Sequence, residues 1–192
     1  MILESHAMLR VTLKTRESPA GTHRPNERLT MTNTPPDSTA VCLATFAAGC
    51  FWGVESIFTQ AKGVIRTRVG YCGGDLDAPA YEQVCTGRTG HAEAVEVEFD
   101  PASISYRALV ELFFELHDPT QLDRQGPDVG SQYRSAIFTH NEEQRLIAIE
   151  VKQTRDTSGQ LQNPICTRIE QASRFWPAED YHQQYCAKRG MT

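Results

Sequence analysis

The sequence predicts an α+β fold, in which helices pack on a mixed, mostly antiparallel sheet. The prediction depends on two apolar patterns that are interspersed along the chain. Short β-prone or alternating runs predict strands at residues 41–47, 64–71, 92–99, 135–139 and 164–170. Apolar residues at helical spacing predict helices at about 52–61, 103–117, 142–155 and 178–188.

The first strand and the first helix are joined by a short segment that contains glycine. Residues 41–47 are apolar and β-prone, and a helical pattern that includes Val54, Ile57 and Phe58 begins at about residue 52. Cys50 therefore lies where the strand passes into the helix, at the helix N-terminus.

The third strand and the helix that follows it have clear patterns. Residues 92–99 alternate, which places Glu93 on the apolar face of the strand. Pro101 ends this strand, and Ser103 or Ser105 can cap the next helix by accepting a backbone N–H bond. That helix carries an apolar stripe typical of a core face, formed by Leu109, Leu112, Phe113 and Leu116.

We expect two parts in the chain of 192 residues. Residues 39–192 have a length suited to one domain. Residues 1–38 are rich in Thr, Pro, Arg, Asn and Ser, so we expect a disordered N-terminal extension. Its arginines are typical of an organellar transit peptide, but four acidic residues argue against one. A true translation start at Met31 explains this segment equally well.

Composition excludes several classes of protein. A net charge of −5 argues against nucleic-acid binding, which needs a basic face. No apolar run is long enough to span a membrane, and the first thirty residues lack the apolar core of a secretory signal. Six cysteines are too sparse for a disulfide framework and lack zinc-site spacing. We therefore expect a cytoplasmic protein with reduced thiols and without a metal or other cofactor.

The segment Gly49-Cys50-Phe51-Trp52-Gly53 has the features of an active site. A thiol at a helix N-terminus faces unpaired backbone N–H groups and the positive end of the helix dipole, which lower its pKa and favour the thiolate. A buried, inert cysteine is the alternative, because free cysteine is among the most buried residue types. Two aromatic residues at the start of a helix cannot both enter the core easily, so we expect Phe51 or Trp52 to line a pocket beside the sulfur.

Residues 46–53, Phe-Ala-Ala-Gly-Cys-Phe-Trp-Gly, resemble the signature of the A-type peptide methionine sulfoxide reductases, which return the S epimer of methionine sulfoxide to methionine. Seven further segments resemble family motifs in the family's order: 70–74, 81–87, 89–95, 117–120, 125–130, 132–135 and 178–183. The resemblance covers about residues 40–188. It implies a catalytic domain at 39–192, built as a two-layer sandwich around a ferredoxin-like βαβ core, that repairs oxidised proteins.

The resemblance also implies catalytic roles. Cys50 would attack the sulfoxide sulfur, and Glu93 would protonate the departing oxygen. Burial on an apolar strand face would raise the pKa of Glu93 toward neutrality, whereas a solvated carboxylate at a strand end is the alternative. Tyr81 and Tyr133 would donate hydrogen bonds to the oxygen. Taken singly, each tyrosine is more often a packing residue.

The substrate pocket would have an apolar side and a polar side. Phe51 and Trp52 would hold the substrate methyl group, since aromatic rings are favourable neighbours of methionine-like sulfur, and they would select the epimer. Asp128 would belong to the polar side, although an ordinary turn carboxylate is the default interpretation of this position.

A second cysteine would condense with the sulfenic acid of Cys50, and thioredoxin would reduce the resulting disulfide. Many relatives carry this resolving cysteine in a glycine-rich C-terminal tail. Cys186 is the only thiol at that end of this chain, so we expect it to resolve the sulfenic acid, with a packing role as the alternative. Cys72, in an expected flexible loop, is the rival, and an external thiol is a further possibility. We expect the remaining cysteines to be buried and inactive: Cys42, Cys85 and Cys166.

The expected substrates are oxidised proteins or free methionine sulfoxide, the expected reductant is thioredoxin, and the expected state is a monomer. Two other classes of function stay open. A thiol hydrolase or acyl transferase would use His91 or His182 as a base directed at Cys50. A non-catalytic module that binds oxidised methionine peptides would need an unreactive Cys50, which slow alkylation at neutral pH would favour.

Overall fold

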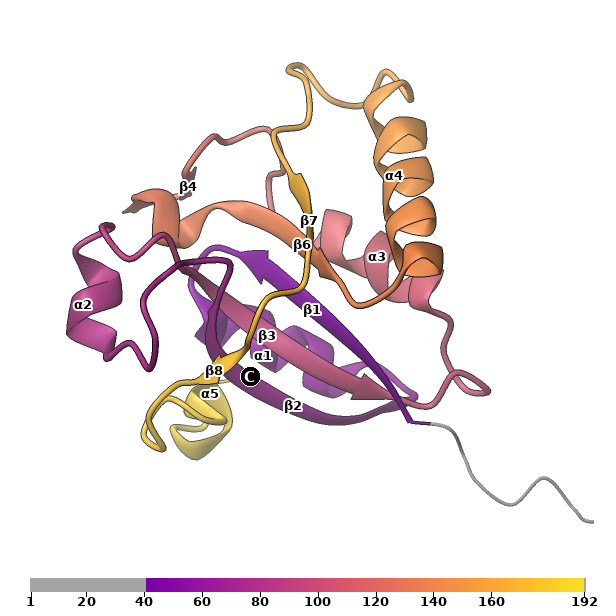
Figure 1. Cartoon of the computed structure of the whole chain (residues 1–192). Coiled ribbons are helices and arrows are strands. Elements are labelled where there is room, and N and C mark those ends of the chain that lie inside the picture. The colour runs from indigo at the N-terminus through magenta and orange to yellow at the C-terminus, as the bar shows by residue number, and fades with distance from the viewer. Residues whose placement is uncertain (1–40, 192) are drawn as a thin grey trace, which may run out of the picture. The chain divides into compact units, whose positions relative to one another are not determined.

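The computed structural model describes residues 41–191, so the extension expected at residues 1–38 lies outside the described part of the chain. Six strands form one sheet (Figure 1): β1 (Cys42–Ala48), β2 (Val64–Cys72), β3 (Ala92–Phe99), β6 (Ser135–Thr139), β7 (Arg168–Gln171) and β8 (Trp176–Pro177). Their order across the sheet is β7-β6-β1-β3-β2-β8, and only the pairing of β6 with β7 is parallel. The predicted α+β class with a mostly antiparallel sheet is confirmed.

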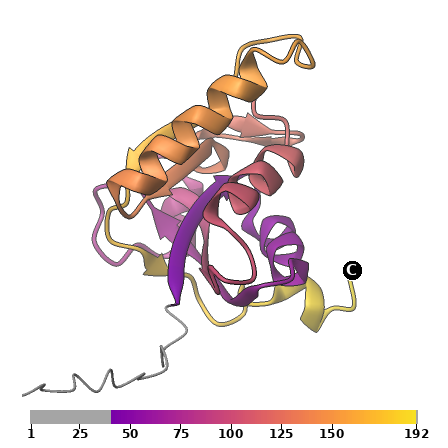
Figure 2. The same cartoon turned by 90° about the vertical axis from the view of Figure 1, so that its right-hand side faces the viewer.

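Three helices pack on one face of this sheet (Figures 1 and 2): α1 (Phe51–Gln60), α3 (Tyr106–Glu115) and α4 (Glu142–Asp156). The ring of Phe46 in β1 stacks on Phe58 of α1, with a centroid distance of 5.0 Å, and on Phe113 of α3, at 5.4 Å. All three rings are buried. Their burial fixes α1, and with it Cys50, against the centre of the sheet.

The other face of the sheet is covered by the chain between β7 and β8, which crosses in front of the sheet in Figure 1. Ala172 and Phe175 of this segment pack on a second cluster of buried side chains. That cluster consists of Ala47, Cys72, Ala92, Ala94, Ala136 and Phe138. Small side chains here let an irregular segment lie close to the strands.

Short elements lie around the sheet: α2 (Tyr81–Cys85), a ribbon of β4 (Arg124–Gln125) and β5 (Asp128–Val129), a 3₁₀ helix η1 (Ser131–Tyr133), and α5 (Tyr185–Lys188). The apolar patterns do not predict α2, η1, the ribbon or β8, because elements of two to five residues are too short to show a period. Four of the short elements, α2, β5, η1 and α5, supply residues to the candidate active site.

The longer elements agree closely with the sequence analysis. The strands predicted at 41–47, 64–71, 92–99 and 135–139 and the helices at 52–61 and 142–155 are confirmed, with bounds that differ by at most one residue. The helix predicted at 103–117 is shorter, and Ser105 caps it by accepting a hydrogen bond from the Ala108 N–H at 3.1 Å. The strand predicted at 164–170 begins only at Arg168. Within residues 41–191, no helix is long and apolar enough to cross a membrane.

The helix predicted at 178–188 is wrong over most of its length. Only Tyr185–Lys188 is helical, because the residues before it bind the edge of β2 instead. The Ala178 N–H donates to the Val69 carbonyl at 3.0 Å. The side-chain amide of Gln183 accepts from the Val69 N–H at 3.0 Å and donates to the Val69 carbonyl at 2.9 Å. These bonds to β2 replace helical bonds and bring the C-terminal segment beside the first helix.

Candidate active site

Cys50 occupies the N-cap position of α1, as the sequence predicts, and its side chain is half-buried. The chain turns sharply into the helix at Gly49, whose φ of +91° is in the region that favours glycine. A Cβ atom at this position would lie 2.7 Å from Cβ of Gln125. Glycine before Cys50 is therefore required by both backbone conformation and space.

Glu93 of β3 lies beside this helix end. It is 2% exposed, and its Oε2 accepts a hydrogen bond from the Phe51 N–H at 3.0 Å. Burial raises the pKa of Glu93 to about 7; the Phe51 N–H opposes the rise and the charge of Asp128 adds to it. The prediction that Glu93 lies on an apolar strand face with a raised pKa is confirmed, and the solvated alternative is wrong.

The prediction of a low pKa for Cys50 is wrong for the resting protein. Burial and the negative charge of Glu93 raise the pKa of the Cys50 thiol to about 11. Hydrogen bonds from the backbone N–H groups of Trp52 and Gly53 favour the thiolate, as expected at a helix N-terminus, but they are outweighed. The first turn of α1 therefore stabilises the thiolate only partly, and burial together with a neighbouring carboxylate keeps the thiol protonated near neutral pH.

Two tyrosines and an aspartate lie around Glu93. Burial, with an added contribution from the charge of Glu93, raises the pKa of Tyr133 to about 12 and also raises the pKa of Tyr81. Both hydroxyl groups therefore stay protonated and can donate hydrogen bonds. The charge of Asp128 acts on both Cys50 and Glu93. The structure thus places Tyr81, Tyr133 and Asp128 within electrostatic reach of the pair that the sequence predicts to be catalytic.

The two aromatic residues after Cys50 are placed differently. Phe51 is buried, whereas Trp52 is half-buried, and their ring centroids are 6.5 Å apart. The Trp52 indole N–H donates to Nδ1 of His182 at 2.9 Å. Tyr185 of α5 stacks on the indole, with ring centroids 3.7 Å apart and an angle of 5° between planes. Trp52 is therefore held both by a hydrogen bond at its edge and by an aromatic ring on its face.

Sequence reasoning did not identify Glu179, and it considered His182 only as a base, so the supporting roles of both residues come from the structure. Glu179 accepts hydrogen bonds from the Tyr71 hydroxyl and from the backbone N–H of Tyr81, both at 2.9 Å. Burial lowers the pKa of His182, so its neutral ring can accept from Trp52. Both residues belong to the segment 178–183, and its resemblance to a family motif is the sequence signal that indicates them, although it does not indicate their partners.

The six cysteines differ in their surroundings, and two expectations about them are wrong. Cys72 is 1% exposed, because it continues β2, pairs with Ala92 and is covered from the second face by the chain before β8. It does not lie in an exposed loop, and it belongs to a different cluster from the residues around Cys50. Cys85, at the end of α2, is exposed and not buried. Cys42 and Cys166 are half-buried.

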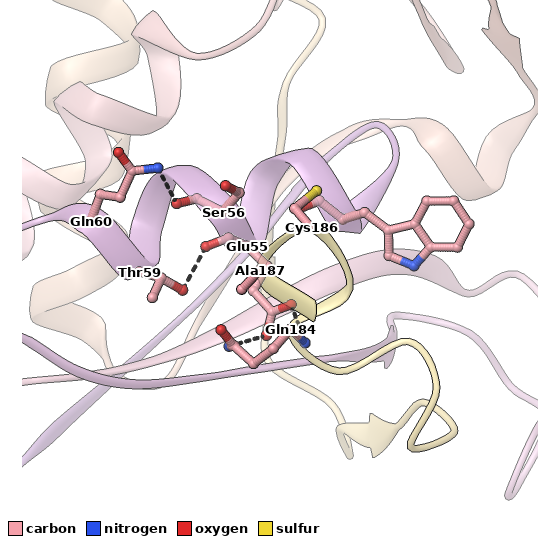
Figure 3. Close-up of a pocket in the computed structure, with 8 residues that line it drawn as sticks. Glu55, Ser56, Thr59, Gln60, Gln184, Cys186 and Ala187 are labelled. Carbon is pink, nitrogen blue, oxygen red and sulfur yellow. Dashed lines mark hydrogen bonds between the residues drawn. The ribbon is translucent and has the colours of Figure 1, made fainter. Parts of the chain in front are cut away.

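Cys186 is the cysteine found beside the first turn of α1. It lies in α5, is half-buried, and its Sγ is 3.4 Å from the Trp52 carbonyl oxygen. The thiol lines a groove between α1 and α5 (Figure 3). This placement brings the C-terminal thiol to the helix that carries Cys50 at its N-cap.

The histidines that a hydrolase would need have other partners. Nδ1 of His91 accepts from the Gly74 N–H at 3.1 Å, and Nε2 is 2.8 Å from the Leu76 carbonyl oxygen. Nδ1 of His182 binds Trp52, and Nε2 is 4.0 Å from Oε2 of Glu179. These contacts give both rings structural roles and favour a carboxyl group, not imidazole, as the proton carrier for Cys50.

Comparisons with known proteins agree with this geometry. Residues 42–191 match a family model described as peptide methionine sulfoxide reductase. The chain is 57% identical over 147 residues to peptide methionine sulfoxide reductase MsrA of Methanoculleus marisnigri, covering 77% of this chain and 90% of the relative. It is 58% identical over 148 residues to the MsrA of Methanosarcina acetivorans, covering 77% and 79% of the two chains.

Solved structures show the same similarity. Methionine sulfoxide reductase A of Corynebacterium diphtheriae matches with a TM-score of 0.74 and 37% identity, over 81% of this chain and 78% of that one. Mxr1 from Saccharomyces cerevisiae in complex with Trx2 matches with a TM-score of 0.55 and 25% identity, over 80% and 91% of the two chains.

Proposed function

Because the chain belongs to the peptide methionine sulfoxide reductase A family and reduces methionine sulfoxide to methionine, we propose that it acts on the S epimer, with Cys50 as its nucleophile and Glu93 as its proton carrier. The observation that carries the proposal is the hydrogen bond from the Phe51 N–H to Glu93. It holds a carboxyl group, whose pKa is about 7, next to Cys50 at the N-terminus of α1.

The proton balance follows from the two pKa values. Between about pH 7 and pH 11 the pair carries one proton, which resides mainly on the Cys50 sulfur because the pKa of that thiol is about 11 and that of Glu93 about 7. When the sulfoxide binds, Cys50 gives up this proton as its sulfur attacks the substrate sulfur. Glu93 passes the proton to the sulfoxide oxygen, while Tyr81 and Tyr133 donate hydrogen bonds to the same oxygen. The protonated oxygen then moves from the substrate sulfur to the Cys50 sulfur: its bond to the substrate sulfur and the transient sulfur–sulfur bond break, and a new S–O bond to Cys50 forms. Methionine leaves, and Cys50 becomes a sulfenic acid.

The substrate methyl group occupies the aromatic side of the pocket in this proposal. Phe51 and Trp52 supply that side, and the hydrogen bond to His182 together with stacking on Tyr185 fixes the indole. Asp128 supplies the polar side. Because oxygen and methyl group need different surroundings, the two sides together select the S epimer.

Recycling uses Cys186 and thioredoxin. The Cys186 thiol attacks the sulfenic acid of Cys50, which gives a disulfide and releases water. A thioredoxin dithiol then reduces this disulfide and is itself oxidised. Two observations support this route: the position of Cys186 beside Trp52, and the similarity to a yeast protein whose structure is described as a complex with Trx2. Burial of Cys72 behind the segment before β8 argues against the rival cysteine.

We further propose that the enzyme acts as a cytoplasmic monomer on free or protein-bound methionine sulfoxide, repairs oxidised proteins, and needs no metal or other cofactor. Its core is ferredoxin-like: β1, α1 and β2 form the βαβ unit, and β3 lies between the two parallel strands.

Turnover of the S and R epimers of a methionine sulfoxide peptide, with thioredoxin as reductant, tests this function. The intact chain is compared with Cys50→Ser, Cys186→Ser and Cys72→Ser. The proposal predicts turnover of the S epimer only, no turnover in Cys50→Ser, loss of thioredoxin-dependent turnover in Cys186→Ser, and full turnover in Cys72→Ser. Turnover that survives in Cys186→Ser would transfer the resolving role to another thiol.

A further inference from the structure

Glu55 is a buried carboxyl group that the proposed mechanism does not use. It lies in α1, five residues after Cys50, and is 2% exposed. Burial raises its pKa, because an ionised carboxylate is costly away from water. Hydrogen bonds offset the cost of burying this carboxyl group, and two of the donors belong to the C-terminal segment.

Both oxygens of Glu55 bind the residue that begins α5. Oε2 accepts from the Gln184 backbone N–H at 2.8 Å, and Oε1 accepts from the Gln184 side-chain amide at 2.7 Å. The Thr67 hydroxyl of β2 donates to Oε1 at 3.2 Å and accepts from the Gln184 amide at 2.8 Å. Figure 3 shows Glu55 facing Gln184 across the groove between α1 and α5. We call this set of bonds the Glu55 clamp.

The backbone of Gln184 is strained in the conformation that the clamp holds. Its φ is +52°, in the left-handed region that residues other than glycine adopt only when their surroundings fix them. Gln184 is the N-cap of α5, which has only four residues and is too short to be stable alone. The clamp therefore determines where α5 begins.

Cys186 lies two residues after Gln184 in this short helix. Its Sγ is 3.4 Å from the Trp52 carbonyl oxygen of α1, so the clamp and the thiol contact the same helix one turn apart. A thiol that is held near its target reacts as if at high concentration, whereas a thiol on a loose tail does not.

We propose that Glu55 is a positioning residue for Cys186, which holds the start of α5 against α1 so that this thiol can reach the sulfenic acid of Cys50. The inference rests on the proposed resolving role of Cys186. It assigns to Glu55 a role in the second half-reaction, disulfide formation, and none in the first, methionine release.

Single-turnover kinetics with Glu55→Gln test the inference. Glutamine keeps the size of the side chain but replaces one acceptor oxygen by an NH₂ donor. This NH₂ group then faces an N–H donor of Gln184, so that hydrogen bond of the clamp is lost. Reduced protein is mixed with one equivalent of an S-methionine sulfoxide peptide, without reductant. Methionine release and the disappearance of the second thiol are followed separately, and dimedone traps any sulfenic acid that persists.

We expect Glu55→Gln to release methionine at the rate of the intact chain and to form the disulfide about tenfold more slowly, the scale for loss of one charge-assisted hydrogen bond. Trapped sulfenic acid should increase accordingly. Gln60→Met is the matched control, because Gln60 lines the same groove but bonds only to the Ser56 carbonyl oxygen. It should leave both half-reactions unchanged. Thr67→Val, which removes one hydroxyl of the clamp, should slow disulfide formation by a smaller factor and serves if Glu55→Gln does not fold.

Two results would overturn the inference: disulfide formation at the normal rate in Glu55→Gln and Thr67→Val, or equal slowing of both half-reactions, which would show a general structural role. Cys186→Ser separates this failure from failure of the proposed function. If Cys186→Ser still forms an internal disulfide, the resolving role itself is wrong. If Cys186→Ser forms none while Glu55→Gln is normal, only the role of Glu55 is wrong.

Discussion

The backbone N–H of Phe51 donates a 3.0 Å hydrogen bond to Oε2 of Glu93. This bond joins the first residue of α1 to a buried carboxyl group on β3, so Cys50 and Glu93, the proposed nucleophile and proton carrier, are held by the same helix end. It also explains why the pKa of Glu93 rises only to about 7, since the N–H group stabilises the ionised form against burial.

The rate of methionine release should depend on pH through the shared proton of Cys50 and Glu93. Below pH 7 both groups are protonated, and the pair must lose one proton before Cys50 can attack. The rate should therefore increase as pH rises through about 7 and then level off. Single-turnover release of methionine, measured from about pH 5.5 to about pH 9, gives this pH dependence. A rate that keeps rising tenfold per pH unit up to pH 9 would contradict it, because ionisation of Cys50 alone would then limit the reaction.

Replacing Glu93 should change the reactivity of Cys50 in two opposite directions. In Glu93→Gln methionine release should fall by about 10²–10⁴-fold, the usual contribution of a positioned proton donor. Alkylation of Cys50 by iodoacetamide at pH 8 should become faster, because burial still raises the thiol pKa but the negative charge that adds to this rise is gone. Mass spectrometry of the Cys50 peptide measures alkylation, with exposed Cys85 as an internal reference. Unchanged alkylation would contradict the assigned effect of Glu93.

Slow alkylation of Cys50 in the intact chain does not by itself favour a non-catalytic binding module. A pKa of about 11 predicts slow alkylation at neutral pH for the enzyme as well. Methionine formation, and not alkylation, therefore distinguishes the two functions.

The hydrogen bond between Trp52 and His182 should act on substrate binding. His182→Phe keeps an aromatic ring but removes the acceptor, so the indole loses its fixed orientation and the KM for an S-sulfoxide peptide should rise about tenfold, as for loss of one buried hydrogen bond. The kcat should change less. Asparagine can place an oxygen near the position of Nδ1, so His182→Asn is the matched control and should restore part of the affinity. Equal KM values in the two variants would show that the hydrogen bond does not matter.

The stacked aromatic rings that pack α1 and α3 on β1 should contribute strongly to stability. Phe46→Ala removes the ring that contacts both Phe58 and Phe113, and should lower the free energy of unfolding by about 3–5 kcal/mol. Leu122→Ala, at a side chain that is 64% exposed, should change it by less than about 0.5 kcal/mol. Urea denaturation followed by circular dichroism measures both values. A loss below about 1 kcal/mol for Phe46→Ala would contradict its central place in the core.

The longer elements could be predicted because each carries enough residues to show a period. The alternation in residues 92–99 even indicated the face on which Glu93 lies. The C-terminal segment could not be predicted in the same way. Its apolar and polar residues fit a helix, but Gln183 uses its side-chain amide to bind the edge of β2, a long-range contact with no local signal.

In the candidate site, too, local patterns predict some features, whereas others depend on long-range contacts. Cys50 at a helix N-terminus follows from the strand-to-helix pattern, but its pKa does not, because that depends on burial in the fold and on a carboxyl group 43 positions later in the chain. Cys72 has the neighbours of a loop residue, Gly73 and Gly74, yet it is buried because a distant segment covers it. Residues such as His182 and Glu179 act through contacts with Trp52 and Tyr81, which only the fold brings together.

The most direct test of the mechanism is methionine formed per protein molecule when the reduced chain meets an excess of an S- or R-methionine sulfoxide peptide without any reductant. The mechanism predicts rapid formation of about one methionine per chain from the S epimer, since one pair of thiols supplies one turnover. It predicts none from the R epimer and none with Cys50→Ser. Methionine formed by Cys50→Ser, or formed equally from both epimers, would contradict the assignment of Cys50 as the nucleophile of a stereospecific reductase.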